Sequence, residues 1–140
     1  MKVRELMSTP VLRIGAEEPV EVAARTLTQY NIGALPVCGA DGKLCGVVTD
    51  RDLVTRCIAA QRSMSATRVR DVMSGNVAFV SPDTDASVAA HLMGRRQIRR
   101  LPVVENGNLL GMLSLADLAR REDSATDASD ALGDISENLR

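Results

Sequence analysis

A chain of 140 residues, of which 45% are hydrophobic, is long enough for one compact domain or for two small halves that share a core. Tyr30 and Phe79 are its only aromatic residues, which disfavours single-stranded nucleic-acid binding because that function relies on aromatic stacking platforms. The net charge of −1 combines +4 on residues 1–121 with −5 on the acidic tail 122–140, and a basic body favours an anionic ligand.

The sequence predicts neither a membrane span nor an export signal. No apolar run approaches the roughly 20 residues of a membrane helix, and the mixed charges of residues 1–5 are not followed by the apolar segment of a secretory signal. We therefore expect a cytoplasmic protein. There, Cys38, Cys45 and Cys57 are expected to be buried free thiols, with an oxidation-sensing Cys38–Cys45 pair as the alternative.

The chain repeats itself after 66 positions. The matching pairs are Val3–Ser8 with Val69–Ser74, Ile32–Val37 with Ile98–Val103 and, after one residue is dropped, Gly46–Leu53 with Gly111–Leu118. We predict a first repeat over residues 1–60, a linker over 61–67 and a second repeat over 68–121. The acidic tail, residues 122–140, is expected to be disordered or to form a short helix that docks on a partner or a dimer mate.

Each repeat predicts the same succession of elements. A leading segment (residues 3–8 or 69–74) is followed by an extended stretch, near 11–14 or 77–80, and then by a helix with Pro19 or Asp85 in its first turn. The residues expected on one buried face of the first such helix are Val20, Ala23, Ala24, Leu27 and Tyr30.

Two short apolar strands come next, Ala34–Cys38 and Leu44–Val48 in the first repeat, joined by a hairpin that contains Asp41-Gly42. Asn106-Gly107 has the same role in the second repeat. The last helix of the first repeat is expected to bury Leu53, Val54, Cys57 and Ile58. Since neither repeat covers both faces of its strands, the two are expected to pack sheet against sheet.

A hydroxyl precedes a carboxylate by three positions where the second strand meets the last helix: Thr49 and Asp52 in one repeat, Ser114 and Asp117 in the other. Spacing alone predicts a helix capping box. The same groups also suit a nucleotide, because a helix N-terminus with a hydroxyl favours phosphate and a carboxylate accepts ribose hydroxyls. Repetition does not separate these interpretations, since duplication copies caps as well as sites.

The combination of Gly46–Leu53, Ile32–Val37 and Val3–Met7, present twice in order, closely resembles the CBS domain, and two tandem copies resemble a Bateman module. The resemblance covers about residues 2–121. It implies an α+β fold of two β-α-β-β-α repeats packed through their sheets with pseudo-twofold symmetry, commonly as homodimers. It also implies clefts between the repeats for adenosyl ligands such as AMP, ADP, ATP or S-adenosylmethionine.

Carried over to this chain, the resemblance implies that Asp52 and Asp117 hold ribose hydroxyls, with Thr49 and Ser114 near the phosphate. The residues it groups with Thr49 and Asp52 are Asn76, Val77, Ala78, Arg99, Arg100 and Pro102. Those it groups with Ser114 and Asp117 are Thr9, Pro10, Val11, Gly33, Ala34 and Pro36.

The two sites are predicted to be unequal. Arg99 and Arg100 replace Gly33 and Ala34, and Arg51 has no charged counterpart in the second repeat. Because arginine binds phosphate through paired hydrogen bonds, the Thr49/Asp52 cleft is expected to prefer a phosphorylated ligand.

The sequence therefore predicts a stand-alone regulatory module that binds an adenosyl ligand and signals to a partner protein or through its own dimer. No required cofactor, metal, membrane or nucleic acid is expected. No catalytic set is visible: the single histidine, His91, is expected on the surface, and the basic run 95–100 is expected to be a solvated face that also binds ligand phosphate. The alternative is a structural or interaction protein that keeps the fold without a ligand, and an enzyme ranks third.

Overall fold

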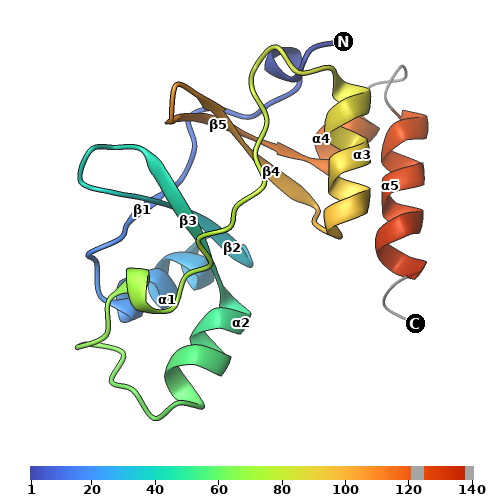
Figure 1. Cartoon of the computed structure of the whole chain (residues 1–140). Helices are drawn as coiled ribbons and strands as arrows, with labels where there is room; N and C mark the ends of the chain where they lie inside the picture. The colour runs from blue at the N-terminus through green and yellow to red at the C-terminus, as the bar shows by residue number, and fades with distance from the viewer. Residues whose placement is uncertain (121–124, 138–140) are drawn as a thin grey trace. The chain divides into compact units, whose positions relative to one another are not determined.

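The computed structural model describes residues 1–120 and 125–137 (Figure 1). The chain forms two compact units. We call Leu12–Val77 the middle unit, and Met1–Val11 together with Ala78–Arg140 the terminal unit. The middle unit therefore contains most of the first repeat, and the terminal unit contains most of the second repeat.

The middle unit is a three-stranded sheet flanked by helices. Its elements are β1 (Ile14–Gly15), α1 (Val20–Gln29), β2 (Ala34–Cys38), β3 (Leu44–Thr49), α2 (Asp50–Leu53), a π-helical continuation of α2 (Val54–Ile58) and a 3₁₀ turn (Val69–Asp71). The central strand β2 pairs in parallel with β1 and antiparallel with β3. Gly42 has a φ of +80° in the hairpin turn, a conformation that glycine adopts without steric cost. The two strands of the hairpin lie where the sequence predicts them.

The core of the middle unit lies between α1, α2 and the sheet. Val20, Ala23 and Leu27 of α1 are buried, as their spacing predicts. Tyr30 is 54% exposed, so its predicted burial is wrong: α1 ends at Gln29 and Tyr30 caps it. Pro19 likewise lies at the N-cap, one residue before the helix rather than in its first turn.

The last helix of the middle unit departs from its predicted face. Leu53 and Cys57 are buried, but Val54 and Ile58 are each more than half exposed. The helix changes from α to π geometry at Val54, and the wider π turn shifts the angular position of every later side chain. A pattern based on 3.6 residues per turn therefore places two of the four residues on the wrong face.

The terminal unit repeats this plan and adds a helix. Its elements are a 3₁₀ turn (Val3–Glu5), α3 (Ala86–Arg96), β4 (Arg100–Glu105), β5 (Asn108–Ser114), α4 (Leu115–Ala119) and α5 (Ala125–Glu137). Asn106 and Gly107 both have positive φ, +53° and +82°, as the predicted hairpin turn requires. The extended stretch predicted at 77–80 makes a single parallel bridge, between Val80 and Val103.

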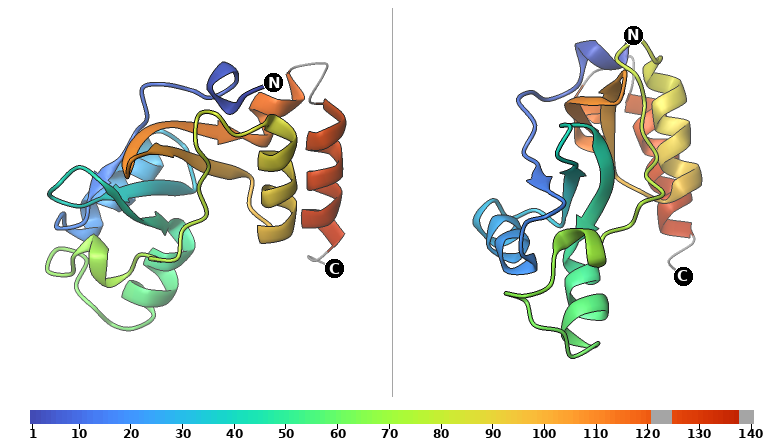
Figure 2. Two further views of the ribbon diagram at one scale, coloured as in Figure 1. Left: turned by 45° about the horizontal axis from the view of Figure 1, so that its top comes forward. Right: turned by 60° about the vertical axis from the view of Figure 1, so that its left-hand side comes forward.

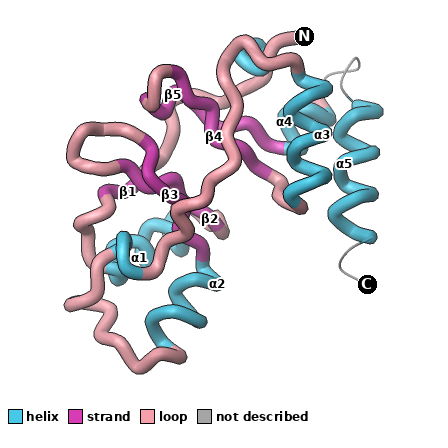
Figure 3. The backbone as a smooth tube through the Cα atoms, viewed as in Figure 1, coloured by secondary structure: helices cyan, strands magenta, loops and turns pink. Residues whose placement is uncertain are grey.

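The acidic tail contains α5, which packs against α3 and α4 of its own unit (Figure 2). Figure 3 shows α3 and α5 side by side, with the strands β4 and β5 leading away from them. Ala128, Ala131 and Ile135 of α5 are buried. Of the two states expected for the tail, the structure has the helix over Ala125–Glu137, and residues 121–124 and 138–140 lie outside the described part.

The leading segments are exchanged between the repeats. In the terminal unit, Ser8 and Met112 exchange two backbone hydrogen bonds, of 2.9 and 3.1 Å. In the middle unit, Ser74 and Val47 do the same, at 2.9 and 3.0 Å. Each leading segment thus packs with the strands of the other repeat, and the α+β class predicted from the sequence is confirmed.

Candidate functional site

The repeated hydroxyl–carboxylate motif forms a capping box in both units. The Asp52 amide donates to Thr49 Oγ1 at 3.0 Å, and the Thr49 amide donates to Asp52 Oδ2 at 3.0 Å. In the terminal unit the Asp117 amide donates to Ser114 Oγ at 3.1 Å, and the Ser114 amide donates to Asp117 Oδ2 at 2.8 Å. The structural interpretation of the motif is therefore correct, and these bonds fix the rotamers of all four side chains.

Capping uses only part of each polar group. Asp52 and Asp117 are buried, with exposed fractions of 9% and 5%, yet each carboxylate gives only its Oδ2 to the cap. The other oxygen, Oδ1, lies beside a guanidinium: 3.8 Å from Arg56 Nε in the middle unit and in an ion pair with Arg120 in the terminal unit. Since an ionised carboxylate has about four acceptor positions, both aspartates keep capacity for hydroxyl donors.

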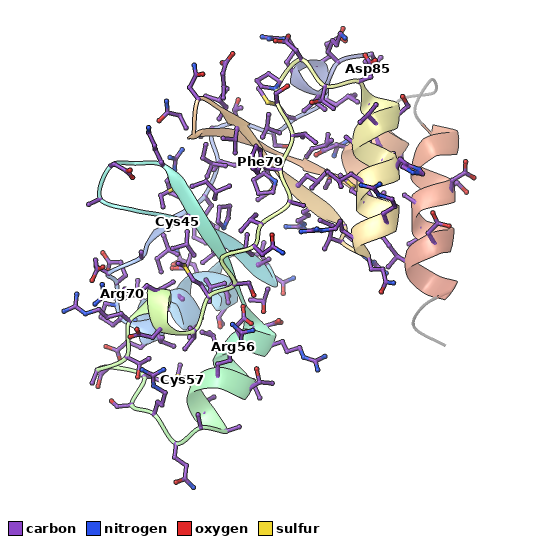
Figure 4. All side chains as sticks on the ribbon, in the orientation of Figure 1. Cys45, Arg56, Cys57, Arg70, Phe79 and Asp85 are labelled. Carbon is purple, nitrogen blue, oxygen red and sulfur yellow. The ribbon has the colours of Figure 1, made fainter. Side chains whose placement is uncertain are left out.

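Arg56 connects the middle-unit motif to the leading segment of the second repeat. Its Nη1 donates to the carbonyl oxygens of Val72 and Met73, at 3.3 and 3.2 Å, while its Nε faces Asp52. Figure 4 shows Arg56 on the helix that follows α2. Arg56 is not among the predicted site residues, because the last helix was predicted only from its apolar face.

The hairpin of the middle unit brings further predicted site residues to Thr49. Ala34 lies opposite Thr49 in the β2–β3 register, and the Asp50 amide donates to the Gly33 carbonyl at 3.1 Å. Pro36 is buried in β2. Asn76 and Val77 belong to the same unit. The predicted grouping of Gly33, Ala34 and Pro36 with the second motif joins two units, and it stays a prediction.

The terminal unit has a pocket of about 520 Å³ at its own motif. The lining residues are Arg99, Arg100, Ser114, Leu115, Ala116, Ala119, Ala128, Ser129 and Leu132. Arg100 lies opposite Ser114 in the β4–β5 register, and the Leu115 amide donates to the Arg99 carbonyl at 3.0 Å. The structure thus brings both arginines to Ser114 within one unit. Their predicted role at Thr49 and Asp52 concerns the other unit and stays a prediction.

The remaining predicted site residues are distributed as follows. Thr9, Pro10 and Val11 belong to the terminal unit, and so do Ala78 and the buried Pro102. Arg51 is exposed in the first turn of α2. The pocket residues of α5 are not among the predicted site residues; the signal for them in the sequence is the helical spacing of Ala131, Leu132 and Ile135.

The cysteines are only partly as predicted. All three are free thiols, and Cys38 and Cys57 are buried, but Cys45 is exposed, so its predicted burial is wrong. Cys45 lies on β3 (Figure 4) and its thiol donates to the Val37 carbonyl at 3.4 Å. Partial burial, and secondarily the nearby Cys38 and Asp41, raise the pKa of the Cys45 thiol.

Other chemistry is sparse in the part of the chain that the structure describes. No cluster of three or more His, Cys, Asp or Glu side chains suited to a metal ion occurs among those residues. His91 is exposed on α3, as predicted. None of the described helices is long and apolar enough to cross a membrane.

Comparison with known proteins agrees with this architecture. The family model of the CBS domain matches residues 3–58 and again residues 69–124. The CBS domain-containing protein YhcV of Bacillus subtilis (strain 168) is 38% identical over 134 residues, which cover 96% of this chain and 94% of that protein.

Solved structures with the same fold include Hypoxic Response Protein I with two coordinated zinc ions, at 30% identity and a TM-score of 0.80, covering 86% of this chain and 98% of that one. A CBS domain pair in complex with 5′-methylthioadenosine and S-adenosyl-L-methionine is 25% identical, with a TM-score of 0.73, and covers 86% of this chain and 94% of that one.

Two tandem repeats with the element order α-β-β-α, each with a capped hydroxyl–carboxylate motif and the first preceded by the short strand β1, define a tandem CBS-domain protein. This chain belongs to the CBS-domain family and carries two copies of the domain. Proteins of this family include some that bind adenosyl ligands.

Proposed function

We propose that this chain is a regulatory module that binds an adenosyl ligand, of the AMP, ADP, ATP or S-adenosylmethionine type, at the Thr49/Asp52 and Ser114/Asp117 motifs. The observation that carries the proposal is the state of the two aspartates. Each is buried and held in one rotamer by the cap, with one oxygen outside the cap. Such a preorganised acceptor suits a pair of ribose hydroxyls, since no side-chain freedom is lost when they bind.

Two further observations support an adenosyl ligand. A structurally similar CBS pair has been solved with 5′-methylthioadenosine and S-adenosyl-L-methionine bound. In this chain, Arg99 and Arg100 line a pocket with Ser114, which suits a ligand that carries an anionic group. Adenine nucleotides carry both an adenosyl group and an anionic phosphate.

The proposed output is regulation rather than catalysis. A ligand that binds two arrangements of the protein with different affinity shifts the balance between them, and a partner protein or a dimer mate reads the shift. The motif residues serve the binding step only: the aspartates accept hydrogen bonds, and the hydroxyls of Thr49 and Ser114 retain a hydrogen to donate after accepting the cap bond.

Thermal unfolding with AMP, ATP and S-adenosylmethionine tests the proposal. A ligand present at about 100 times its dissociation constant stabilises the folded state by about 2.7 kcal/mol, which raises Tm by about 5–10 °C for a chain of this size. The double variant Asp52→Asn/Asp117→Asn should lose the increase, because each amide keeps the shape but offers one acceptor oxygen instead of two. Asp41→Asn, on the exposed hairpin, is the control. A wild-type Tm that none of the three compounds moves would favour the alternative, a structural protein without a ligand.

A further inference from the structure

Helix α5 begins at Ala125 and so lies entirely beyond the residues that match the CBS domain, which end at 124, yet it packs into the terminal unit. It contacts α3 and α4 (Figure 2), and Ala128, Ala131 and Ile135 are each no more than 5% exposed. The middle unit, all of whose residues the structure describes, has no third helix of this kind. The helix therefore distinguishes one unit from the other.

Gly94 on α3 permits the close approach of α5. A Cβ at Gly94 would lie 2.8 Å from Asp134 Oδ2 and 3.4 Å from Ala131 Cα, so alanine would already require the Asp134 side chain to move, and a larger side chain would push the helices apart. The matching position in the first repeat is Thr28, an exposed residue of α1. The site for a packed helix is thus present on α3 and absent from α1.

The same helix forms part of the pocket at Ser114. Three α5 residues, Ala128, Ser129 and Leu132, line it together with Arg99, Arg100 and the start of α4. Leu132 is 43% exposed, so its apolar surface is not used up by packing against the unit. The lining therefore combines two arginines, Arg99 and Arg100, with apolar and hydroxyl-bearing residues of α5.

We propose that α5 completes the ligand site of the terminal unit, with Ser129 and Leu132 as ligand-contacting residues, and that occupancy of this pocket holds α5 against α3. The inference rests on the proposed function, because the occupant is the adenosyl ligand of the Ser114/Asp117 motif. A ligand that contacts both α5 and the rest of the unit binds the docked arrangement more tightly. By linkage, it stabilises docking by the same factor by which docking improves its binding. The middle unit senses a ligand without this output.

The test measures binding to the full-length chain by calorimetry in an Asp52→Asn background, which leaves the terminal-unit motif intact. AMP and S-adenosylmethionine serve as separate probes. Gly94→Leu displaces α5 from α3 without altering a residue that lines the pocket. Leu132→Ala removes the apolar contribution of Leu132 to the pocket wall at an exposed position, and adds no charge that would attract the phosphate of AMP. Gly133→Ala is the matched control in α5, because its Cβ would meet nothing within 4 Å.

Both Gly94→Leu and Leu132→Ala should weaken binding of the probe by about tenfold or more, within the usual range for coupled sites, and Gly133→Ala should not. Hydrogen exchange adds a second measurement: the probe should slow exchange of the α5 amides in the wild-type chain but not in Gly94→Leu. Equal affinities in all three variants, with α5 exchange unaffected by the probe, would overturn the role of α5 and leave the proposed function standing. If neither probe binds the wild-type chain, the proposed function fails and this inference fails with it.

Discussion

The sulfur atom of Met7 lies 2.9 Å from the point where a Cβ on Gly111 would stand. The same relationship occurs in the middle unit, where Met73 Sδ is 2.6 Å from the corresponding point on Gly46. In both units a leading segment lies flat on the second hairpin strand, and glycine leaves the space that the methionine side chain fills. Each methionine therefore packs against the glycine of the other repeat, Met7 against Gly111 and Met73 against Gly46.

Gly111→Ala and Gly46→Ala should each destabilise the chain by about 1–3 kcal/mol, the usual cost of overpacking a filled site. The backbone contributes to this cost, because the carbonyl oxygens of Ser8 and Ser74 lie 3.0 and 2.8 Å from the two added carbons and cannot rotate away. Urea unfolding measures the change.

The control for these two variants is Gly75→Ala, whose added Cβ would be 4.0 Å from its nearest neighbour. Its unfolding midpoint should stay close to that of the wild-type chain. Equal midpoints for all three variants would show that the methionines do not hold the leading segments in place.

The turn of the second hairpin should depend on its glycine. Gly107 has a φ of +82°, which costs an alanine roughly 1–2 kcal/mol. Gly107→Ala is therefore expected to lower the free energy of unfolding by about this amount, whereas Asn106→Gly, at a φ of +53°, should change it little. A loss of stability that is larger for Asn106→Gly than for Gly107→Ala would contradict the turn geometry.

Arg100→Ala should weaken AMP binding about tenfold or more, since a charge-assisted hydrogen bond to phosphate contributes roughly 1.5–3 kcal/mol. Binding of adenosine, which has no phosphate, should be unchanged. Calorimetry in Asp52→Asn and Asp117→Asn backgrounds assigns the arginine to a site. The prediction from the sequence, that it serves Thr49 and Asp52, requires the loss to persist in the Asp117→Asn background and to disappear in Asp52→Asn.

Cys45 should be the cysteine that an alkylating reagent modifies in the folded chain. It is exposed, while Cys38 and Cys57 are buried. Because its pKa is raised, its thiolate fraction at neutral pH is smaller than that of an unperturbed thiol. The alkylation rate of Cys45 should therefore increase over a higher pH range than the rate of a cysteine in a short peptide. Mass spectrometry after iodoacetamide treatment identifies the modified site; faster labelling of Cys57 than of Cys45 in the folded chain would contradict the structure.

The ion pair between Lys2 and Asp85 ties the first leading segment to α3 at a distance of 2.9 Å. Its hydrogen bond and charge lower the pKa of Asp85 and raise the pKa of Lys2. The contribution of Asp85 to the free energy of unfolding is therefore fully present above the ordinary carboxyl pKa. It disappears as pH falls through the lowered pKa of Asp85. The contribution of Lys2 disappears only as pH rises through its raised pKa, above 10.5.

Asp85→Asn should be slightly less stable than the wild-type chain at pH 7, because both side chains of the pair are more than half exposed and solvent screens their interaction. The difference should vanish in acid. Unfolding midpoints measured between pH 2 and pH 7 test this, and a difference that grows in acid would contradict the assigned pair.

Local signals predicted the hairpins and the capped motifs correctly, because Asp41-Gly42, Asn106-Gly107 and the hydroxyl–carboxylate spacing each act within a few residues. The errors arise where a pattern assumes a helix of fixed pitch and length. Tyr30 lies just past the end of α1, and Val54 and Ile58 lie in a π turn that an α-helical period cannot represent.

The candidate site was predicted less completely than the fold. The sequence identified Asp52 and Asp117, and the resemblance grouped Thr9, Pro10 and Val11 with the motif of the other repeat. The motifs alone do not predict the exchange of the leading segments, because both repeats carry the same motifs and either pairing fits the pattern. Residues of α5 were not predicted as pocket residues, because a helix in the tail was expected to dock on a partner or a dimer mate. Gly94 lies inside α3, whereas the matching position of the first repeat is Thr28. A glycine at this place in a helix was the signal for a packed helix.

The exchange of leading segments has a consequence for any chain that holds one repeat alone. Such a chain would expose the glycine of its second hairpin strand. Its leading segment, with the methionine, would have no strand of another repeat to pack against. Two copies would satisfy both surfaces by reciprocal swapping, so the smallest self-sufficient form of a single repeat is a swapped dimer. Cutting this protein at the linker, residues 61–67, therefore separates two halves that each lack a part of their own fold, whereas a cut near residue 11 or 77 follows the boundaries of the units.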